Sequence, residues 1–155
     1  MVRALFLEYP EDPTSWLIED QYLFGTDLLV APLMEEAPDR EVYLPPGSWI
    51  DYQDDKVYEG ARWHNMQTGM VPVIMLVRDG AAIPHADLAQ STREIDWHSL
   101  QLKVFCARAE AAEGLICLPE DGELHALRLE RAKDGFALEE DALGGRVAWR
   151  VVPSA

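Results

Sequence analysis

Apolar and polar residues follow two different patterns along the chain, and the change between them comes at residues 34–40. Residues 4–9 and 28–33 are almost continuous apolar runs, which are typical of strands buried on both faces, as in parallel sheets covered by helices. Between them, residues 11–15 indicate a helix start, and Gly25 is placed to end the helix. The first part therefore reads as strand, short helical connection and strand. Two such strands alone would have unpaired edges, so we expect further sheet upstream.

After residue 40 the pattern is that of short antiparallel strands separated by turn residues. Pro45-Pro46-Gly47, Asp54-Asp55-Lys56 and Arg78-Asp79-Gly80 are turn signals. The strands that we expect here cover residues 41–44, 48–52, 57–59, 62–64, 71–77 and 81–84. This spacing predicts a sandwich or a rolled sheet.

A second β unit is predicted after a polar linker that follows Pro84. Its expected strands cover residues 100–106, 115–118, 124–129, 136–138 and 147–152. If the first two form a hairpin centred between Ala111 and Ala112, Cys106 and Cys117 fall opposite each other. We interpret both cysteines as small apolar fillers, because nothing in the sequence lowers the pKa of a thiol as a redox pair requires.

Composition excludes several classes of partner. The chain of 155 residues is 48% hydrophobic, enough to bury a core, and its 28 acidic against 13 basic residues give a net charge of −15. This charge argues against binding to nucleic acid or to an anionic membrane. No apolar run approaches the roughly 20 residues that span a bilayer, and the start of the chain does not read as a signal peptide. We expect a soluble cytoplasmic protein, in which two cysteines are too few for a disulfide framework.

Three blocks of sequence, in the same order, resemble family 31 glycoside hydrolases. Residues 3–13 (RALFLEYPEDP) and 20–32 (DQYLFGTDLLVAP) resemble the end of the family's catalytic barrel, and residues 42–51 (VYLPPGSWID) resemble the start of its proximal C-terminal β domain. Residues 60–64, 72–73 and 77–79 look most like the α-xylosidase branch, and the hairpin at 117–122 is similar to the distal β domain.

This resemblance implies a mainly β chain made of three parts. Residues 1–33 would be the last strands of a (β/α)8 barrel, residues 34–86 a proximal β-sandwich, and residues 87–155 part of a distal β domain. The family's enzymes release α-linked xylose or glucose with retention, which needs two carboxylates about 5–5.5 Å apart. Both belong to earlier barrel strands, the nucleophile in a Trp-x-Asp-Met-Asn-Glu-like motif that this chain lacks.

We therefore expect no catalytic residue here, no cofactor, and no activity of the chain alone. Its role would be structural, with the missing barrel of its own enzyme as partner and an α-xyloside or α-glucoside as the substrate of the parent enzyme. The alternative is a stand-alone, non-catalytic β module that binds glycan or protein. The sequence leaves open xylose against glucose, and leaves open the oligomeric state, for which a homo-oligomer is one alternative.

Glu8 is the one candidate for substrate binding. It closes the first predicted strand, and barrel enzymes gather their sites at the carboxyl ends of strands, so it could accept a hydrogen bond behind the residues that touch the sugar. The alternative, which we favour, is an acid at a strand end that forms a salt bridge. For Asp27 we expect a turn or capping role.

Aromatic and acidic residues suggest further sites that we interpret structurally. Trp49, Tyr52, Trp63 and His64 could stack on sugars, but aromatic residues on half-buried strands more often lie in the core or at domain interfaces. The four histidines, at 64, 85, 98 and 125, lack the spacing of metal ligands, so we expect no metal site. Asp54-Asp55 and Glu139-Glu140-Asp141 read as solvated turns.

Overall fold

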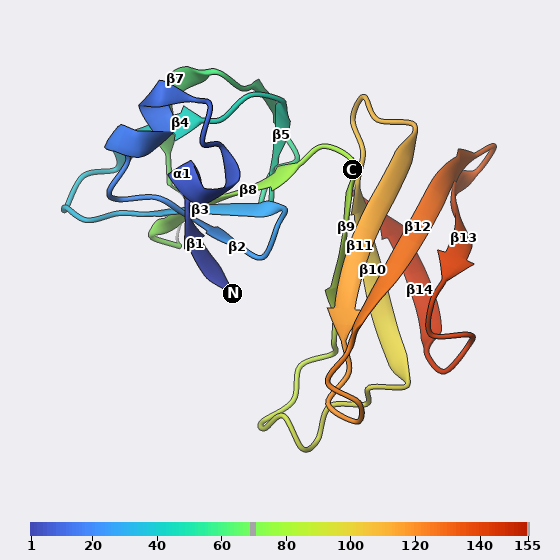
Figure 1. Cartoon of the computed structure of the whole chain (residues 1–155). Coiled ribbons are helices and arrows are strands. Elements are labelled where there is room, and N and C mark those ends of the chain that lie inside the picture. Colours follow the sequence, from blue (N-terminus) through green and yellow to red (C-terminus); the bar gives the residue numbers. More distant parts are fainter. Residues whose placement is uncertain (69–70, 155) are drawn as a thin grey trace. The chain divides into compact units, whose positions relative to one another are not determined.

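The computed structural model describes residues 1–68 and 71–154, and it is mainly β (Figure 1). The chain divides into two compact units, Met1–Asp79 (unit 1) and Gly80–Ala155 (unit 2). The boundary falls in the predicted turn Arg78-Asp79-Gly80. Residues 1–33 are not a compact unit of their own, because strand β3 (Leu28–Pro32) pairs with β8 (Val73–Arg78) throughout its length.

The main sheet of unit 1 has the strand order β1-β2-β3-β8-β5-β6, and every neighbouring pair is antiparallel. Besides β3 and β8, its strands are β1 (Val2–Ala4), β2 (Tyr22–Phe24), β5 (Ser48–Asp51) and β6 (Val57–Glu59). β4 (Asp39–Leu44) and β7 (Arg62–Gln67) form a separate antiparallel pair. The expectation of parallel strands in residues 1–33 is therefore wrong, and β8 supplies the neighbour that β3 needed.

Two further predictions for the first 25 residues are wrong. Residues 5–8 form a helical turn, α1 (Leu5–Glu8), in which the Tyr9 N–H donates to the Leu5 carbonyl at 2.9 Å. Only one side of this run is buried, since Leu5 is fully buried and Leu7 is 61% exposed, so a strand buried on both faces does not form. The predicted helix is a short 3-10 helix, η1 (Pro13–Leu17), and Gly25 lies in the β2–β3 turn with a φ of 73° instead of ending a helix.

Unit 2 is one six-stranded sheet with the order β13-β12-β11-β9-β10-β14. Its strands are β9 (Ala81–His85), β10 (Ser99–Phe105), β11 (Ala111–Cys117), β12 (Leu124–Ala132), β13 (Gly135–Asp141) and β14 (Ala148–Pro153). β9 lies between β10 and β11, so the predicted hairpin of those two strands is wrong. Cys117 pairs with Leu124 instead of facing Cys106, and both thiols are free.

Gly114 explains why β9 can enter between β10 and β11. A Cβ atom at this position would lie 2.3 Å from the Ala82 carbonyl oxygen, so only glycine allows β11 to approach β9 this closely. Glu113 pairs with Ala81 in a parallel register at the same place. The sequence pattern of residues 100–118 favoured the local hairpin, whereas the close backbone approach at Gly114 favours the non-local pairing.

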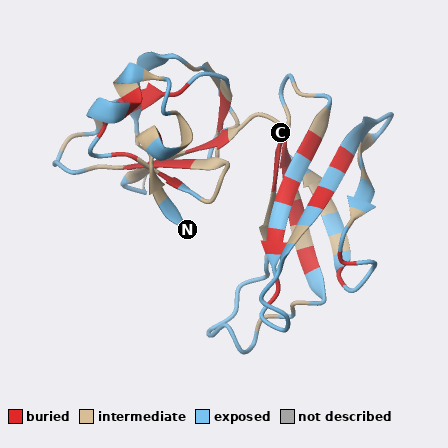
Figure 2. Cartoon of the chain, in the orientation of Figure 1, coloured by how far each residue is buried: buried red, intermediate tan, exposed pale blue. Residues whose placement is uncertain are grey.

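The sheet of unit 2 must be curled, because β13 and β14 are its opposite edges and are joined by residues 142–147. The edges of a flat six-stranded sheet would be roughly 24 Å apart. The connecting loop is tightened by hydrogen bonds, from Gly144 N to Asp141 O and from Arg146 N to Leu143 O, and cannot span that distance. The resulting roll encloses one core, and Figure 2 shows the buried and exposed residues alternating along β11 and β12.

Each unit has its own core. In unit 1 it is centred on Trp49, with Leu5, Leu23, Leu29 and Leu76 all fully buried. In unit 2 it contains Leu100, Leu102 and Val104 of β10 and Leu127 and Leu129 of β12, together with apolar residues of β9, β11 and the connections. Among the residues that the structure describes, no helix has the length and apolar character to cross a membrane.

Candidate functional site

A surface hollow of about 570 Å³ lies in unit 1, where the segment between α1 and η1 meets β4. Its lining residues are Glu8, Tyr9, Pro10, Glu11, Asp12, Pro13, Tyr43, Pro46 and Ala61. Ala61 has a φ of 57°, a left-handed conformation that few residues other than glycine adopt. Prolines, a methyl group and two tyrosine rings make the hollow largely apolar, with carboxylates at three positions.

Asp12 and Tyr43 fix the shape of the hollow. The Tyr43 hydroxyl donates to Asp12 Oδ2 at 2.6 Å, and the other Asp12 oxygen accepts from the Thr14 N–H at 3.0 Å, which begins η1. Burial, together with this bond to a carboxylate, raises the pKa of Tyr43 to about 12. The backbone of Tyr43 is held by the buried Gln21 side chain, through bonds of 2.8 and 2.9 Å. The Asp12 carboxylate therefore stabilises local structure.

Glu8 lies in the wall of the hollow and forms ion pairs inside unit 1. Its carboxylate is 3.1 Å from Arg3 and 3.6 Å from Arg78. The same Arg78 lies 3.8 Å from Asp27, and its guanidinium donates to the Thr26 carbonyl at 2.9 Å. These contacts agree with the salt-bridge interpretation of Glu8, and a role in substrate binding stays a prediction.

Arg78 is the residue of this region that sequence reasoning missed. Its guanidinium lies 5.7 Å from the Tyr9 ring and 5.9 Å from the Trp49 ring, as well as beside the two carboxylates. Burial raises the pKa of Tyr9, while the charge of Arg78 acts in the opposite direction. The sequence signal for these contacts is a basic residue at the end of an apolar strand, in a region rich in acidic residues. From the sequence, Arg78 is placed in a turn and in the resemblance to the α-xylosidase branch, and no contact is predicted for its side chain.

The aromatic residues considered for sugar stacking are not one platform. Trp49 is fully buried and donates to the Pro45 carbonyl at 2.9 Å, which confirms the core interpretation for this residue. Trp63 is 49% exposed, with its ring 5.5 Å from that of Tyr43. The His64 ring lies 5.3 Å from the Tyr58 ring, edge to face. Tyr52, which directly follows β5, is half-buried.

Exposed large apolar side chains are concentrated in unit 1. Of the thirteen in the described part of the chain, ten belong to this unit: Met1, Val2, Leu7, Trp16, Leu17, Phe24, Met34, Val57, Trp63 and Val71. Val2 and Phe24 are direct cross-strand partners at the edge of the sheet. Trp16 stacks on Phe6 with ring centroids 4.9 Å apart. The N-terminal segments of unit 1 thus carry an apolar surface.

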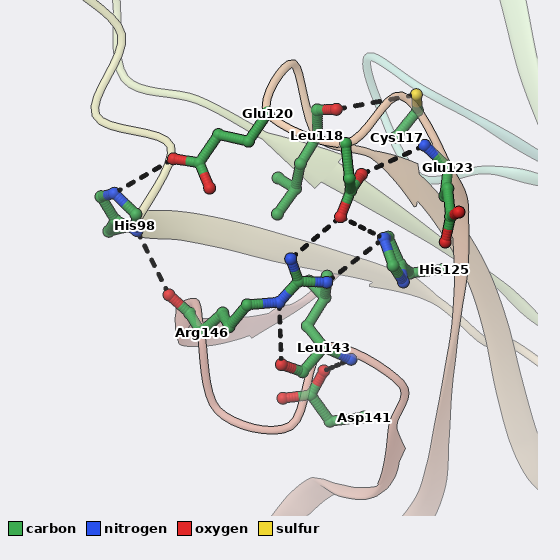
Figure 3. Close-up of polar contacts among 10 residues, drawn as sticks. His98, Cys117, Leu118, Glu120, Glu123, His125, Asp141, Leu143 and Arg146 are labelled. Atoms are coloured by element: carbon green, nitrogen blue, oxygen red, sulfur yellow. Dashed lines mark hydrogen bonds and ion pairs between the residues drawn. The ribbon is translucent and has the colours of Figure 1, made fainter.

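A polar network lies at one end of the roll in unit 2 (Figure 3). Asp121 Oδ2 is 2.9 Å from a guanidinium nitrogen of Arg146 and 3.0 Å from Nε2 of His125, and Asp121 Oδ1 accepts from the Glu123 N–H at 3.1 Å. The bonds from the Glu123 backbone and from Arg146 lower the pKa of Asp121 to about 2. The network joins the β11–β12 turn to the β13–β14 loop.

The remaining candidate residues do not form a metal centre. Within the described residues, no group of three or more histidine, cysteine, aspartate or glutamate side chains is arranged to hold a metal ion. Asp54 accepts from Lys56 at 2.6 Å in an exposed turn, as expected. The turn interpretation is wrong for residues 139–141, which are the end of strand β13, where Glu140 and Asp141 pair with β12. His85 and His98 hydrogen-bond to backbone carbonyl groups.

Known proteins with similar sequences or structures include α-glucosidases, α-xylosidases and a dextranase. The model of the glycosyl hydrolase family 31 C-terminal domain matches residues 1–83. Alpha-glucosidase 2 of Bacillus thermoamyloliquefaciens is 34% identical over 63% of this chain and 13% of its own length. This chain therefore spans about an eighth of that relative.

Two solved structures extend the similarity into unit 2. A GH31 dextranase of Flavobacterium johnsoniae has a TM-score of 0.77 and 26% identity, over 88% of this chain and 18% of its own. The GH31 alpha-xylosidase of Xanthomonas citri has a TM-score of 0.72 and 26% identity, over 98% of this chain and 18% of its own. Since the family model covers more than half of the sequence, the chain belongs to glycosyl hydrolase family 31 and contains the family's C-terminal domain.

Proposed function

We propose that this chain is the non-catalytic, C-terminal portion of a retaining α-glycosidase that hydrolyses terminal α-xylosyl or α-glucosyl residues. Unit 1 packs against the catalytic barrel through its N-terminal segments and buttresses it, and unit 2 is the distal β domain. The match of residues 1–83 to the family's C-terminal domain supports this role. The names of the similar proteins include both a glucosidase and a xylosidase, so the choice of sugar is left open.

The observation that carries the proposal is the apolar surface of unit 1. Leu7 and Leu17 are 61% and 78% exposed, and Phe24 is 55% exposed beside Val2 on an edge strand. Large apolar side chains exposed at several positions of the same N-terminal segments favour a surface that is covered in a larger assembly. The neighbouring hollow is lined by Pro10, whose carbonyl accepts from Trp16 Nε1 at 3.0 Å, so the hollow and the apolar surface adjoin.

The antiparallel pairing of β1, β2 and β3 affects how residues 1–33 relate to the barrel. Strands of a (β/α)8 barrel are parallel, whereas β3 is antiparallel to both of its neighbours. This favours a position of residues 1–33 against the barrel over membership in it. Their assignment to the barrel's last strands stays a prediction, as does the cytoplasmic location.

Exposed leucines provide a matched test of whether the apolar surface of unit 1 is a docking surface for the catalytic barrel. Leu7→Ser with Leu17→Ser removes two apolar side chains from unit 1, and Leu88→Ser with Leu124→Ser removes two from unit 2, where they are 106% and 73% exposed. We expect the unit 1 variant to lower the binding of the dye ANS, and any self-association in sedimentation velocity, by about twofold or more. The unit 2 variant should leave both unchanged. Equal effects of the two variants would contradict a docking surface on unit 1.

Activity assays test the non-catalytic part of the proposal. Purified chain should hydrolyse neither nitrophenyl α-xyloside nor nitrophenyl α-glucoside, because retention requires a pair of carboxylates about 5–5.5 Å apart, and Glu8 and Asp12 are bound to groups of unit 1. Turnover that disappears when a residue of this chain is changed would overturn it.

A further inference from the structure

The β13–β14 loop closes one end of the roll in unit 2. Leu143 and Val147 in this loop are 3% and 4% exposed, so they form part of the core. Gly144 and Gly145 have φ values of 60° and 81°, and both lie in the left-handed region that favours glycine. The Asp141 carboxylate accepts from the Leu143 and Gly145 N–H groups at 2.9 and 3.2 Å. The loop therefore has a defined conformation and covers the end of the core.

β14, which follows this loop, has little support of its own. It pairs only with β10, in parallel from Ser99↔Ala148 to Val104↔Pro153, and parallel pairing is slightly less stable per residue than antiparallel pairing. None of its six residues is fully buried, whereas β10 has four that are; Trp149 and Val151 of β14 pack against the core but stay half-buried. We therefore expect the position of β14 to depend in part on the loop that precedes it.

We propose that Asp121, His125 and Arg146 form an end latch, which fastens the β13–β14 loop to the β11–β12 turn and so holds β14 beside β10. Arg146 Nη1 lies 2.9 Å from Asp121 Oδ2, and Arg146 Nε donates to the Leu143 carbonyl of its own loop at 3.3 Å. Figure 3 shows Arg146 extended from its loop toward His125. A bond between two ionised groups is about twice as strong as one between neutral groups.

His125 has a secondary part in the latch. Its Nε2 atom lies 3.0 Å from the Asp121 carboxylate and 3.3 Å from a guanidinium nitrogen of Arg146. One ring nitrogen cannot donate to the carboxylate and accept from the guanidinium at the same time. Whichever it does, the contact between Asp121 and Arg146 is kept. The pair of Asp121 and Arg146 is therefore the essential part, and substitution of His125 should have the smaller effect.

A third segment is attached at the same place. The ring of His98 lies 3.4 Å from the Arg146 carbonyl and 3.6 Å from the Glu120 carboxylate, and the Ala148 N–H donates to the His98 carbonyl at 2.7 Å. His98 immediately precedes β10, the strand on which β14 depends. The latch thus joins both strands of the parallel pair to the β11–β12 turn.

Hydrogen exchange of the whole chain tests the latch strand by strand. Asp121→Asn keeps an oxygen for the Glu123 N–H but removes the charge that faces Arg146, and we expect amides of β14 to exchange at least about fivefold faster, the effect of losing one charged hydrogen bond. Amides of β4 and β7 in unit 1 should not change. The control Glu123→Gln removes a charge of the same sign from the same turn without altering a latch atom, and should leave β14 unchanged.

Two more measurements identify a latch as the cause. Arg146→Met should accelerate exchange in β14 as Asp121→Asn does, and the double variant should add little to either, because both remove one contact. If a variant does not fold, raising NaCl from 0.02 to about 1 M with the wild-type chain should accelerate β14 relative to β12, since the pair is partly exposed and is screened by salt. Unchanged β14 exchange, or equal acceleration of all strands of unit 2, would overturn the proposal.

Discussion

Unit 1 and unit 2 are nearly equal in length, but they bury their β-sheets in different ways. Among its described residues, unit 1 leaves ten large apolar side chains exposed, and it has a short edge strand, β1. Unit 2 exposes three, and its sheet curls until its edge strands approach each other. Unit 1 therefore has a surface suited to a larger partner, whereas unit 2 closes upon itself.

Charge sharpens the difference. Unit 1 contains 15 acidic and only five basic residues, and three of these cations, Arg3, Arg40 and Arg78, each join segments that are distant in sequence. In unit 2 the cations are more numerous, and Arg128 and Arg146 pair with acids on neighbouring strands or turns. Unit 1 is therefore the more acidic of the two, with one basic residue for every three acidic ones.

We expect the largest effect from a substitution that disrupts the core of one unit and leaves the core of the other intact. Trp49→Ala removes a fully buried side chain and its hydrogen bond to Pro45, and should lower the free energy of unfolding of unit 1 by about 3–5 kcal/mol. Unit 2 should keep its stability, because its core contains none of the residues around Trp49. Hydrogen exchange during a urea titration, followed separately for β8 and β12, measures both units.

The matched substitution in unit 2 is Leu102→Ala, which should lower the free energy of unfolding of that unit by about 2–5 kcal/mol and leave β8 protected. If either substitution opens β8 and β12 together at the same urea concentration, the units unfold as one and the comparison between them fails.

The intermediate effect is a response to alkaline pH that should occur in unit 1 alone. All five tyrosines lie in this unit, and the pKa of Tyr43 is raised to about 12 from an ordinary value of 10.0. Because the folded state favours the protonated hydroxyl, the stabilisation is complete below pH 10.0 and is lost as pH rises toward about 12. We expect a loss of roughly 2 kcal/mol over this interval.

Tyr43→Phe isolates this contribution. The variant should be about 1–2 kcal/mol less stable at neutral pH, since it lacks the bond to Asp12, and the fall in stability of unit 1 between pH 9 and about 11 should be correspondingly shallower. Tyr9 remains, with a raised pKa of its own, so some dependence persists. Unit 2 serves as the internal control, and identical pH profiles of the wild-type and variant chains would show that the Tyr43 hydroxyl does not titrate with folding.

Short strands with alternating residues could be predicted from the sequence, and non-local pairings could not. Local alternation and turn residues placed β4 to β7 and β12 to β14 near their observed positions. The order of strands in unit 2 depends on the approach of β11 to β9 at Gly114, which no local pattern signals. Residues 5–8 were mistaken for a strand because an apolar run does not show which of its side chains will be buried.

The same limit applies to the residues of the candidate sites, whose contacts are non-local and could not be predicted from the sequence. Glu8 was identified from its place after an apolar run, but its partners Arg3 and Arg78 come from β1 and β8 and are brought together only by the sheet. The network of Asp121, His125 and Arg146 was also missed, because Asp121 and Arg146 lie in two separate connections of unit 2 and His125 lies in β12. In both cases each residue alone looks like a solvated surface charge.

The smallest expected effect tests the two interpretations of Glu8. Glu8→Gln removes the charge from a carboxylate that pairs with Arg3 and Arg78, whose side chains are 27% and 36% exposed. Partly exposed pairs contribute about 0.2–1 kcal/mol each, so unit 1 should lose up to about 1 kcal/mol at low ionic strength and less in 1 M NaCl. Urea unfolding at the two salt concentrations measures the difference.

Glu41→Gln is the control, because Glu41 is an exposed acid of β4 in the same acidic unit. Its substitution should leave stability unchanged or raise it slightly, since it relieves repulsion in a unit of 15 acids and five bases. If Glu8→Gln behaves in the same way as Glu41→Gln, the ion pairs of Glu8 do not stabilise unit 1. The carboxylate would then have no structural role to explain its place in the wall of the hollow, and the interpretation of Glu8 as an acceptor near the substrate of the complete enzyme would be favoured.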